Sequence, residues 1–163
     1  MKPGLNVGDV GELFWTVDPS MVITLGGDPR ATVFSTPNMI LLMERAAREA
    51  LRPFLEDGEE SVGVDVHVQH VGGVSLGAVV KGIARVTNID DRRIAFDVTA
   101  MAGDRILGTG SHLRALIRLD RLIDSLAKQS GEDRRAINPL VPPAALPHFK
   151  TLLAPLVTNL SDK

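Results

Sequence analysis

The sequence predicts an α+β fold in which an antiparallel sheet packs around one long helix, and three observations support this prediction. Residues 39–54 contain no glycine and have helical periodicity. Four later segments alternate apolar and polar residues with a period of two, which is typical of half-buried strands. Short turn-rich breaks separate the last three of these segments, and such breaks favour hairpins between antiparallel neighbours.

The first expected elements are a strand over 10–17 and a shorter one over 21–25. The long helix is expected over roughly 37–53. Its start is predicted from Ser35-Thr36-Pro37, with the Thr36 hydroxyl as the N-cap, because proline fits the first helical turn without needing an amide donor. The apolar residues of this segment share one face of a helical wheel and its arginines share the other, so the helix is amphipathic.

Four consecutive strands are expected after the helix. Valines at 62, 64, 66 and 68 define the first, which extends to His70. The others are expected at 76–89, 94–101 and 106–117, the last three as antiparallel neighbours. A sheet wrapped around one long central helix is the hotdog architecture, and we expect that fold here.

The C-terminal part of the chain is expected to form a helical and proline-rich extension. Residues 119–126 have helical spacing, and residues 130–137 are interpreted as a linker. Prolines at 139, 142, 143, 147 and 155 exclude one continuous helix beyond it. With 163 residues the chain has room for one core, so we predict a hotdog domain over 1–128 and a partly irregular extension over 129–163.

Composition excludes several functional classes. The net charge is −2 with no block of like charges, which argues against a nucleic-acid partner. The chain has no cysteine, which excludes disulfides, thiolate metal sites and cysteine nucleophiles. No apolar run approaches the length of a membrane span, so we expect a soluble, cytoplasmic protein without a membrane partner.

Three polar residues stand out against this background. His70 has the parity of the four valines, so its ring is expected to point toward the core, either as a catalytic group or as a structural histidine bonded to a carbonyl. Glu44 is the first charge after five apolar residues and lies at the border of the apolar face. It could act as a base or nucleophile, or form a surface pair with Arg48 worth about 0.2 to 0.5 kcal/mol. Thr36 lies at a helix N-terminus, where an oxyanion would also be stabilised.

These residues occur within motifs that resemble one known family. The motifs are VFSTPNM at 33–39 running into LMERA at 42–46, SVG at 61–63, His70, and GTGSHLR at 108–114. In order and spacing they are similar to the fluoroacetyl-CoA thioesterase family of hotdog proteins, and the resemblance covers about residues 3–120.

The resemblance implies a function and a set of site residues. Thr36, Glu44 and His70 match the family's catalytic threonine, glutamate and histidine, and Gly63 and Arg114 match a glycine and an arginine that bind substrate. It implies hydrolysis of a small or medium acyl-CoA to a carboxylic acid and CoA, without a metal or organic cofactor. It also implies a homodimer with the acyl-CoA sites near the dimer interface.

The sequence leaves some points open. Thr36 and Glu44 would be separated by about 12 Å along a regular helix, so they can meet one substrate only if the helix begins late or the chain folds back. Residues 25–32 replace an aromatic-bearing lid of the family's namesake, so fluoroacetyl specificity is not expected. A non-catalytic acyl-CoA or small-ligand binding module is the main alternative. A hotdog hydratase would need an aspartate and a histidine near the helix entry, and residues 35–39 supply neither.

Overall fold

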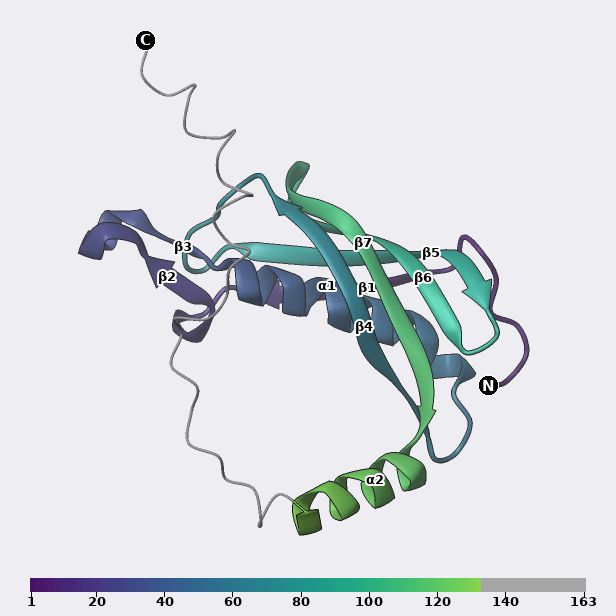
Figure 1. Cartoon of the computed structure of the whole chain (residues 1–163). Helices are drawn as coiled ribbons and strands as arrows, with labels where there is room; N and C mark the ends of the chain where they lie inside the picture. The colour runs from purple at the N-terminus through teal and green to yellow at the C-terminus, as the bar shows by residue number, and fades with distance from the viewer. Residues whose placement is uncertain (133–163) are drawn as a thin grey trace, which may run out of the picture. The chain divides into compact units, whose positions relative to one another are not determined.

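A computed structural model describes residues 1–132 of the chain. Five strands form one antiparallel sheet in the order β1-β5-β6-β7-β4 (Figure 1). Consecutive strands β5, β6 and β7 are neighbours, as the short breaks predicted, while β4 pairs with β7 and forms one edge. The strands are β1 (Val10–Thr16), β4 (Glu59–His70), β5 (Val79–Asp90), β6 (Arg93–Ala102) and β7 (Arg105–Arg118).

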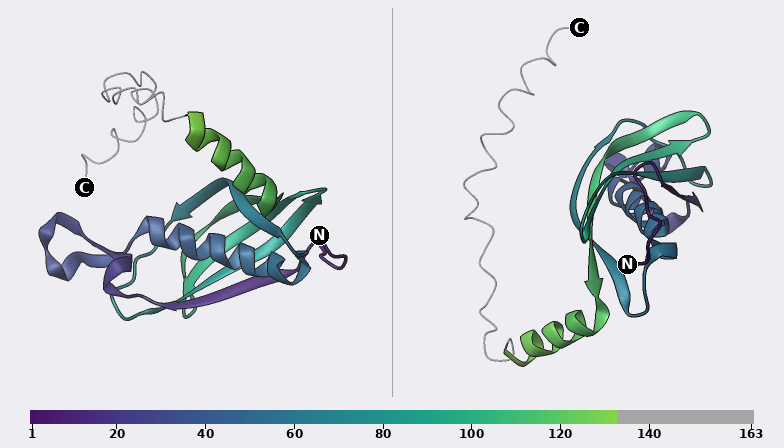
Figure 2. Two further views of the ribbon diagram at one scale, coloured as in Figure 1. Left: turned by 90° about the horizontal axis from the view of Figure 1, so that it is seen from below. Right: turned by 90° about the vertical axis from the view of Figure 1, so that its right-hand side faces the viewer.

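The helix α1 (Thr36–Leu51) lies against the sheet, which curls around it (Figure 2). Its apolar face is fully buried, and Met39, Leu42 and Met43 have no exposed surface. Leu51 ends the helix, and a 3-10 turn over Arg52–Phe54 follows because Pro53 lacks the N–H that would continue the α-helical ladder. Apolar side chains from β5, β6 and β7 complete the core: Val80, Ala84, Val86, Ile94, Phe96, Val98 and Leu107.

The prediction for the start of α1 was wrong by one residue. Ser35 is the N-cap, and its carbonyl accepts the Met39 N–H at 3.0 Å, so Thr36 is already helical. The Ser35 hydroxyl accepts a hydrogen bond from the Asn38 side chain at 2.8 Å. This leaves the Thr36 hydroxyl available for a partner outside the helix.

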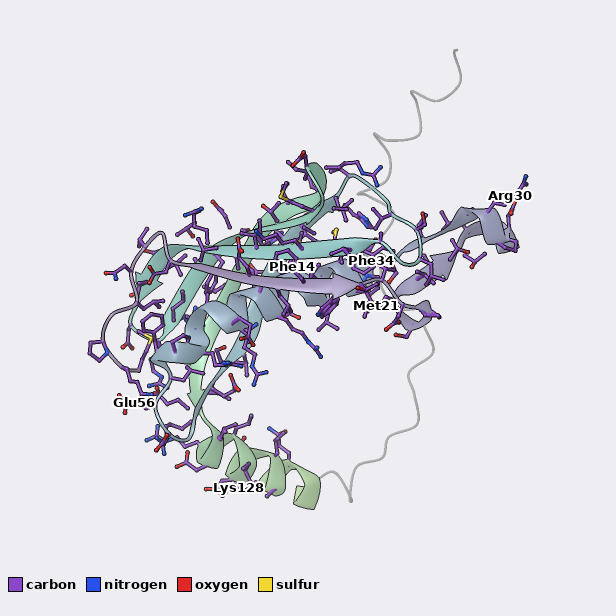
Figure 3. All side chains as sticks on the ribbon, turned by 180° about the vertical axis from the view of Figure 1, so that it is seen from behind. Phe14, Met21, Arg30, Phe34, Glu56 and Lys128 are labelled. Carbon is purple, nitrogen blue, oxygen red and sulfur yellow. The ribbon has the colours of Figure 1, made fainter. Side chains whose placement is uncertain are left out.

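A two-stranded hairpin precedes α1 and was only half predicted. It pairs β2 (Val22–Thr24) with β3 (Thr32–Phe34), and 3-10 turns over Leu25–Gly27 and Pro29–Ala31 connect them. The strand β3 was missed because three residues are too few to show alternation. We call residues 22–34 the flap, and Figure 3 shows Arg30 at its free tip.

The edge strand β4 contains a bulge. Pairing with β7 shifts between Gly63 and Asp65, so Val64 has no partner opposite it. Since side chains alternate along a strand, one extra residue reverses their direction. Ser61 is buried on the helix side, and beyond the bulge Val66 pairs with the buried His112. The prediction that all four valines share the face of His70 was therefore wrong for Val62, although His70 does face the helix.

The helix α2 (Leu119–Glu132) follows β7 directly. The predicted helix at 119–126 is present, and it continues through the first three residues of the predicted linker. Residues Met1–Ser125 form one compact unit and a second unit begins at Leu126. The proline-rich segment lies outside the described residues. Within residues 1–132, no helix is both long enough and apolar enough to cross a membrane.

Candidate functional site

Thr36 and His70 form a hydrogen-bonded pair at the N-terminus of α1. The first residue of the helix and the last residue of β4 bring the Thr36 Oγ1 to 2.8 Å from the His70 Nδ1. The other ring nitrogen, Nε2, lies 2.9 Å from the Gly72 carbonyl oxygen. A carbonyl oxygen only accepts, so Nε2 carries the ring proton and Nδ1 accepts the Thr36 O–H. This geometry pairs a hydroxyl nucleophile with a base.

Glu44 belongs to a second cluster, further along α1. Its Oε1 lies 3.7 Å from the His112 Nε2 and 3.9 Å from the Arg114 Nη1, and its side chain is one-third exposed. The alternative pairing with Arg48 is not formed, because Arg48 donates instead to Glu60 on β4. Glu44 therefore lies at the border of the apolar face, as predicted, with its carboxylate turned toward the sheet.

Gly63 lies directly beneath the Glu44 carboxylate. A Cβ at this position would overlap the Glu44 Oε1 and would lie 3.2 Å from the ring of His112. The bare backbone of Gly63 therefore leaves the space that the carboxylate occupies. A cavity of about 370 Å³ opens here, lined by Glu44, Gly63, Val64, Asp65, Val66 and His112.

Arg114 is buried beside this cavity, where it makes hydrogen bonds to Ser61, His112 and the Glu44 backbone as well as its ion pair with the Glu44 carboxylate. Its Nε donates to the Ser61 Oγ at 3.0 Å and its Nη2 to the Ser61 carbonyl at 2.6 Å. Its Nη1 lies 3.3 Å from the Glu44 carbonyl oxygen and 3.2 Å from the His112 Nε2. Burial lowers the pKa of Arg114, and the nearby carboxylates of Glu44 and Glu60 oppose that shift.

The predicted site residues thus fall into two groups within one chain. Thr36 and His70 form the first, and Glu44, Gly63 and Arg114 form the second. The helix begins at Thr36 and is regular through Glu44, so the two groups are about 12 Å apart along its axis. The sequence allowed two ways to bring Thr36 and Glu44 together, a late start of the helix or a fold-back of the chain. The structure has neither.

Sequence reasoning missed Ser61 and His112 as members of the second group. His112 lies two residues before Arg114 on one strand, so the two share a face, and this parity was the signal that could have found it. Ser61 could not have been found in this way. It lies before the bulge, so its parity relative to His70 does not show that the two residues share a face.

The flap forms one wall of a separate hollow. This hollow has a volume of about 610 Å³ and no aromatic side chain among its lining residues, which are Pro29, Arg30, Thr32, Val33, Gly73, Val74, Ser75, Leu76, Ala78 and Arg105. It reaches Gly73, three residues beyond His70. Residues 25–32, which replace the family's lid, therefore lie close to the Thr36–His70 pair.

The chain is similar to known proteins in sequence. Residues 17–120 match the family described as fluoroacetyl-CoA-specific thioesterase. A fluoroacetyl-CoA thioesterase from Streptantibioticus cattleyicolor is 37% identical over 127 residues, which cover 74% of this chain and 91% of that protein.

Solved structures show the same fold. The crystal structure of a point mutant of the fluoroacetyl-CoA-specific thioesterase superimposes with a TM-score of 0.70 at 30% identity, covering 78% of this chain and 99% of that one. A hot-dog-like protein from Thermanaerovibrio acidaminovorans has a TM-score of 0.68 at 23% identity, covering 78% and 93% respectively. The second likeness concerns the fold alone, and together they confirm the predicted hotdog architecture.

Proposed function

Since this chain belongs to the fluoroacetyl-CoA-specific thioesterase family, whose members are hotdog thioester hydrolases, we propose that it hydrolyses a small or medium acyl-CoA through Thr36, His70 and Glu44. The observation that carries this assignment is the 2.8 Å hydrogen bond between the Thr36 Oγ1 and the His70 Nδ1. This hydrogen bond places a base beside the hydroxyl nucleophile before the substrate binds.

In the proposed reaction the Thr36 Oγ1 attacks the thioester carbonyl carbon while His70 takes its proton. The carbon–sulfur bond breaks, His70 passes the proton to the CoA thiolate, and an acyl-threonine ester remains. Glu44 then takes a proton from a water molecule that attacks this ester. The bond between the acyl carbon and the Thr36 Oγ1 then breaks, Glu44 passes the proton to the Thr36 Oγ1, and the acyl group leaves as a carboxylic acid.

The separation of the two groups along α1 supports a site shared between two copies of the chain. The strand β4 is an edge strand with a neighbour on one side only among the described residues, and Val64 and Val66 on it are exposed. Unpaired edge strands are ready partners for a second strand. We propose a twofold homodimer in which β4 pairs antiparallel with β4 of the partner subunit.

Such pairing would unite the two groups. In an antiparallel pair of identical strands, the numbers of facing residues have a constant sum, and beyond the bulge this sum is even because facing residues lie on the same side of a sheet. A sum of 134 pairs His67 with itself and puts His70 of one copy opposite the bulge at Gly63 and Val64 of the other, beside the Glu44 that Gly63 accommodates. Each complete site would then take Thr36 and His70 from one copy and Glu44 and Arg114 from the partner subunit.

The acyl group is proposed to be something other than fluoroacetyl. The flap at 22–34 carries one aromatic residue, Phe34, and that side chain is buried in the core at 1% exposure. It therefore offers no aromatic ring to the hollow near the Thr36–His70 pair.

The first experiment measures free-thiol release from acyl-CoAs of graded chain length. Thr36→Val, Glu44→Gln and His70→Ala are each expected to lose at least about 100-fold in kcat, the size of an acid–base contribution. Glu49→Gln, on the side of α1 away from the sheet, is the matched control that should retain activity. Thermal stabilisation by acyl-CoA without thiol release from the wild type would instead favour the binding-module alternative.

The shared site has its own test. Co-expressed Glu44→Gln and His70→Ala chains, purified as mixed dimers through two different tags, would contain one intact site in every two. About half the wild-type activity per dimer is expected, although each variant alone is inactive. Mixed dimers as inactive as the parents would show that each site lies within one chain.

A further inference from the structure

We propose that His112 is a positioning residue that holds Arg114 against the Glu44 carboxylate through a neutral, proton-accepting Nε2. The inference rests on the proposed function, since it assigns a role within the same site. His112 lies on β7 with 3% of its surface exposed, and it has no role in the proposed reaction of Thr36, His70 and Glu44.

The hydrogen-bond partners of His112 define its protonation state. Its Nδ1 lies 2.8 Å from the Asp65 carbonyl oxygen, which only accepts, so Nδ1 carries the proton. Its Nε2 faces the Arg114 Nη1 at 3.2 Å, and a guanidinium nitrogen only donates. The ring therefore donates to β4 and accepts from Arg114, and the neutral Nδ1–H tautomer is the one state that satisfies both contacts.

The contact with His112 completes the fixation of Arg114. Ser61 binds one side of the guanidinium through Nε and Nη2, which leaves Nη1 to be oriented. The His112 Nε2 and the Glu44 carbonyl oxygen hold that nitrogen 3.9 Å from the Glu44 Oε1. The positive charge attracts the carboxylate, and the imidazole ring lies beneath it at 3.7 Å. Glu44 is thereby placed over Gly63 at the mouth of the cavity.

The charged groups that face His112 come from three elements: Glu44 on α1, Asp65 on β4 and Arg114 on β7. Burial lowers the pKa of His112 and Arg114 lowers it further, while the hydrogen bond to the Asp65 carbonyl and the carboxylates of Glu44 and Asp65 act in the opposite direction. Protonation would set two N–H groups and two positive charges against each other at 3.2 Å. The Arg114 Nη1 would then keep only the Glu44 carbonyl oxygen as an acceptor, and the Glu44 carboxylate would be drawn to the charged ring.

The main test compares His112→Phe with His112→Gln in the full-length enzyme. Phenylalanine keeps a ring but supplies no acceptor, so kcat is expected to fall by about 10- to 100-fold, the effect of misplacing a reacting group, with little change in KM. Glutamine offers an amide oxygen to Arg114 and cannot be protonated, so it should recover most of the loss. Equal losses in the two variants would overturn the proposal.

A second measurement does not depend on turnover. Long-range ¹H–¹⁵N NMR of the histidine rings should show His112 protonated at Nδ1 and unprotonated at Nε2 at neutral pH. A proton on Nε2 at neutral pH would overturn the inference even if His112→Phe failed to fold. Absence of thiol release by the wild type, with this tautomer observed, would reject the proposed function and leave the His112–Arg114 contact standing.

The pH profile separates positioning from a merely structural role. Wild-type kcat is expected to fall on the acid side over the range in which NMR shows His112 taking up a proton. His112→Gln should lack that part of the acid limb. An acid limb unchanged in His112→Gln would contradict the proposal.

Discussion

At the scale of single residues, Gly63 shows how little space the site contains. Its missing side chain leaves room for the Glu44 Oε1, and its φ lies outside the left-handed region, so an alanine would meet no backbone strain there. The atom nearest to such a Cβ is the far end of the flexible Glu44 side chain, and the His112 ring, at 3.2 Å, would have to give by only a few tenths of an ångström. A substitution would therefore move the carboxylate and leave the fold intact.

Gly63→Ala is accordingly expected to lower kcat by about 10- to 100-fold while the melting temperature changes little. Thiol release and thermal unfolding of the same preparation check this. In the Glu44→Gln background, Gly63→Ala should have almost no additional effect, because the group that it displaces is already inactive. Additive losses would mean that Gly63 acts on something other than Glu44.

His112 also makes the stability of the protein depend on pH. Its pKa in the folded protein lies below its ordinary value of 6.5, so the unfolded chain binds more protons as the pH falls below about that value. Neutral His112 therefore makes its full contribution to the free energy of unfolding above pH 6.5. This contribution declines as the pH falls toward the pKa of His112 in the folded protein.

Urea unfolding at a series of pH values checks this expectation. The wild type should lose stability below pH 6.5, and His112→Gln should show a smaller decline over the same interval, since glutamine does not titrate. Identical slopes in the wild type and His112→Gln would contradict the prediction.

The site residues show what a sequence reveals at this scale and what it does not. Thr36, Glu44 and His70 were predicted from helix entry, an isolated charge and strand parity. The cap assignment for Thr36 failed because Ser35 fits the same signal one position earlier. Parity predicted the direction of His70 correctly, but the bulge at Val64 breaks the alternation that suggested it, and no residue pattern marks that bulge.

At the scale of elements, β1 and α1 are in close contact. A Cβ on Gly11 would overlap the Ala46 carbonyl oxygen and lie 2.8 Å from the Ala50 Cβ. The strand therefore packs against the helix backbone through a glycine and two alanines. This contact sets how near the helix comes to the edge of the sheet.

Gly11→Ala is expected to destabilise the protein by about 1 to 3 kcal/mol, the usual cost of overpacking a close contact. Chemical unfolding measures it. Gly73→Ala is a matched control, because a Cβ there would make only ordinary contact with Val33, 3.6 Å away. A stability of Gly11→Ala equal to that of the control would show that α1 can shift without cost.

Long elements were predictable and short ones were not. The helix and the four strands after it have enough residues for periodicity to show, and their short connections predicted which strands are neighbours. The strand β3 and the two 3-10 turns of the flap occupy three residues each, too few for any period. The pairing of β4 with β7 depends on how the whole sheet curls around α1. The pattern of residues within one strand does not indicate this.

At the scale of the whole molecule, the proposed dimer makes activity depend on the free edge of β4. Backbone N–H groups point alternately to the two sides of a strand, so of two adjacent residues one donates toward β7 and the other toward the edge. Val66 and His67 are adjacent, and His67 lies at the middle of the proposed β4–β4 pairing. Proline at either position removes one N–H.

Val66→Pro and His67→Pro should therefore behave differently. One is expected to disturb β7 pairing and lower the melting temperature, and the other to remain folded but become monomeric and inactive. Analytical ultracentrifugation, thermal unfolding and thiol release on both variants check this. If both remain dimeric and active, β4 does not form the interface.

The bulge at Val64 has a consequence for how the chain can change. Gly63 and His70 are seven positions apart, an odd number, so in an uninterrupted strand they would point to opposite faces. The inserted residue changes the phase once between them, and both then lie on the face toward α1. Deleting Val64 would remove the extra residue and the change of phase together, so Gly63 and the histidine would then be six positions apart and still share a face. One more residue between them, without a second bulge, would instead turn one half of the site outward. This strand can therefore lose a residue at the bulge and keep the direction of its site residues, but it cannot gain one in the same way.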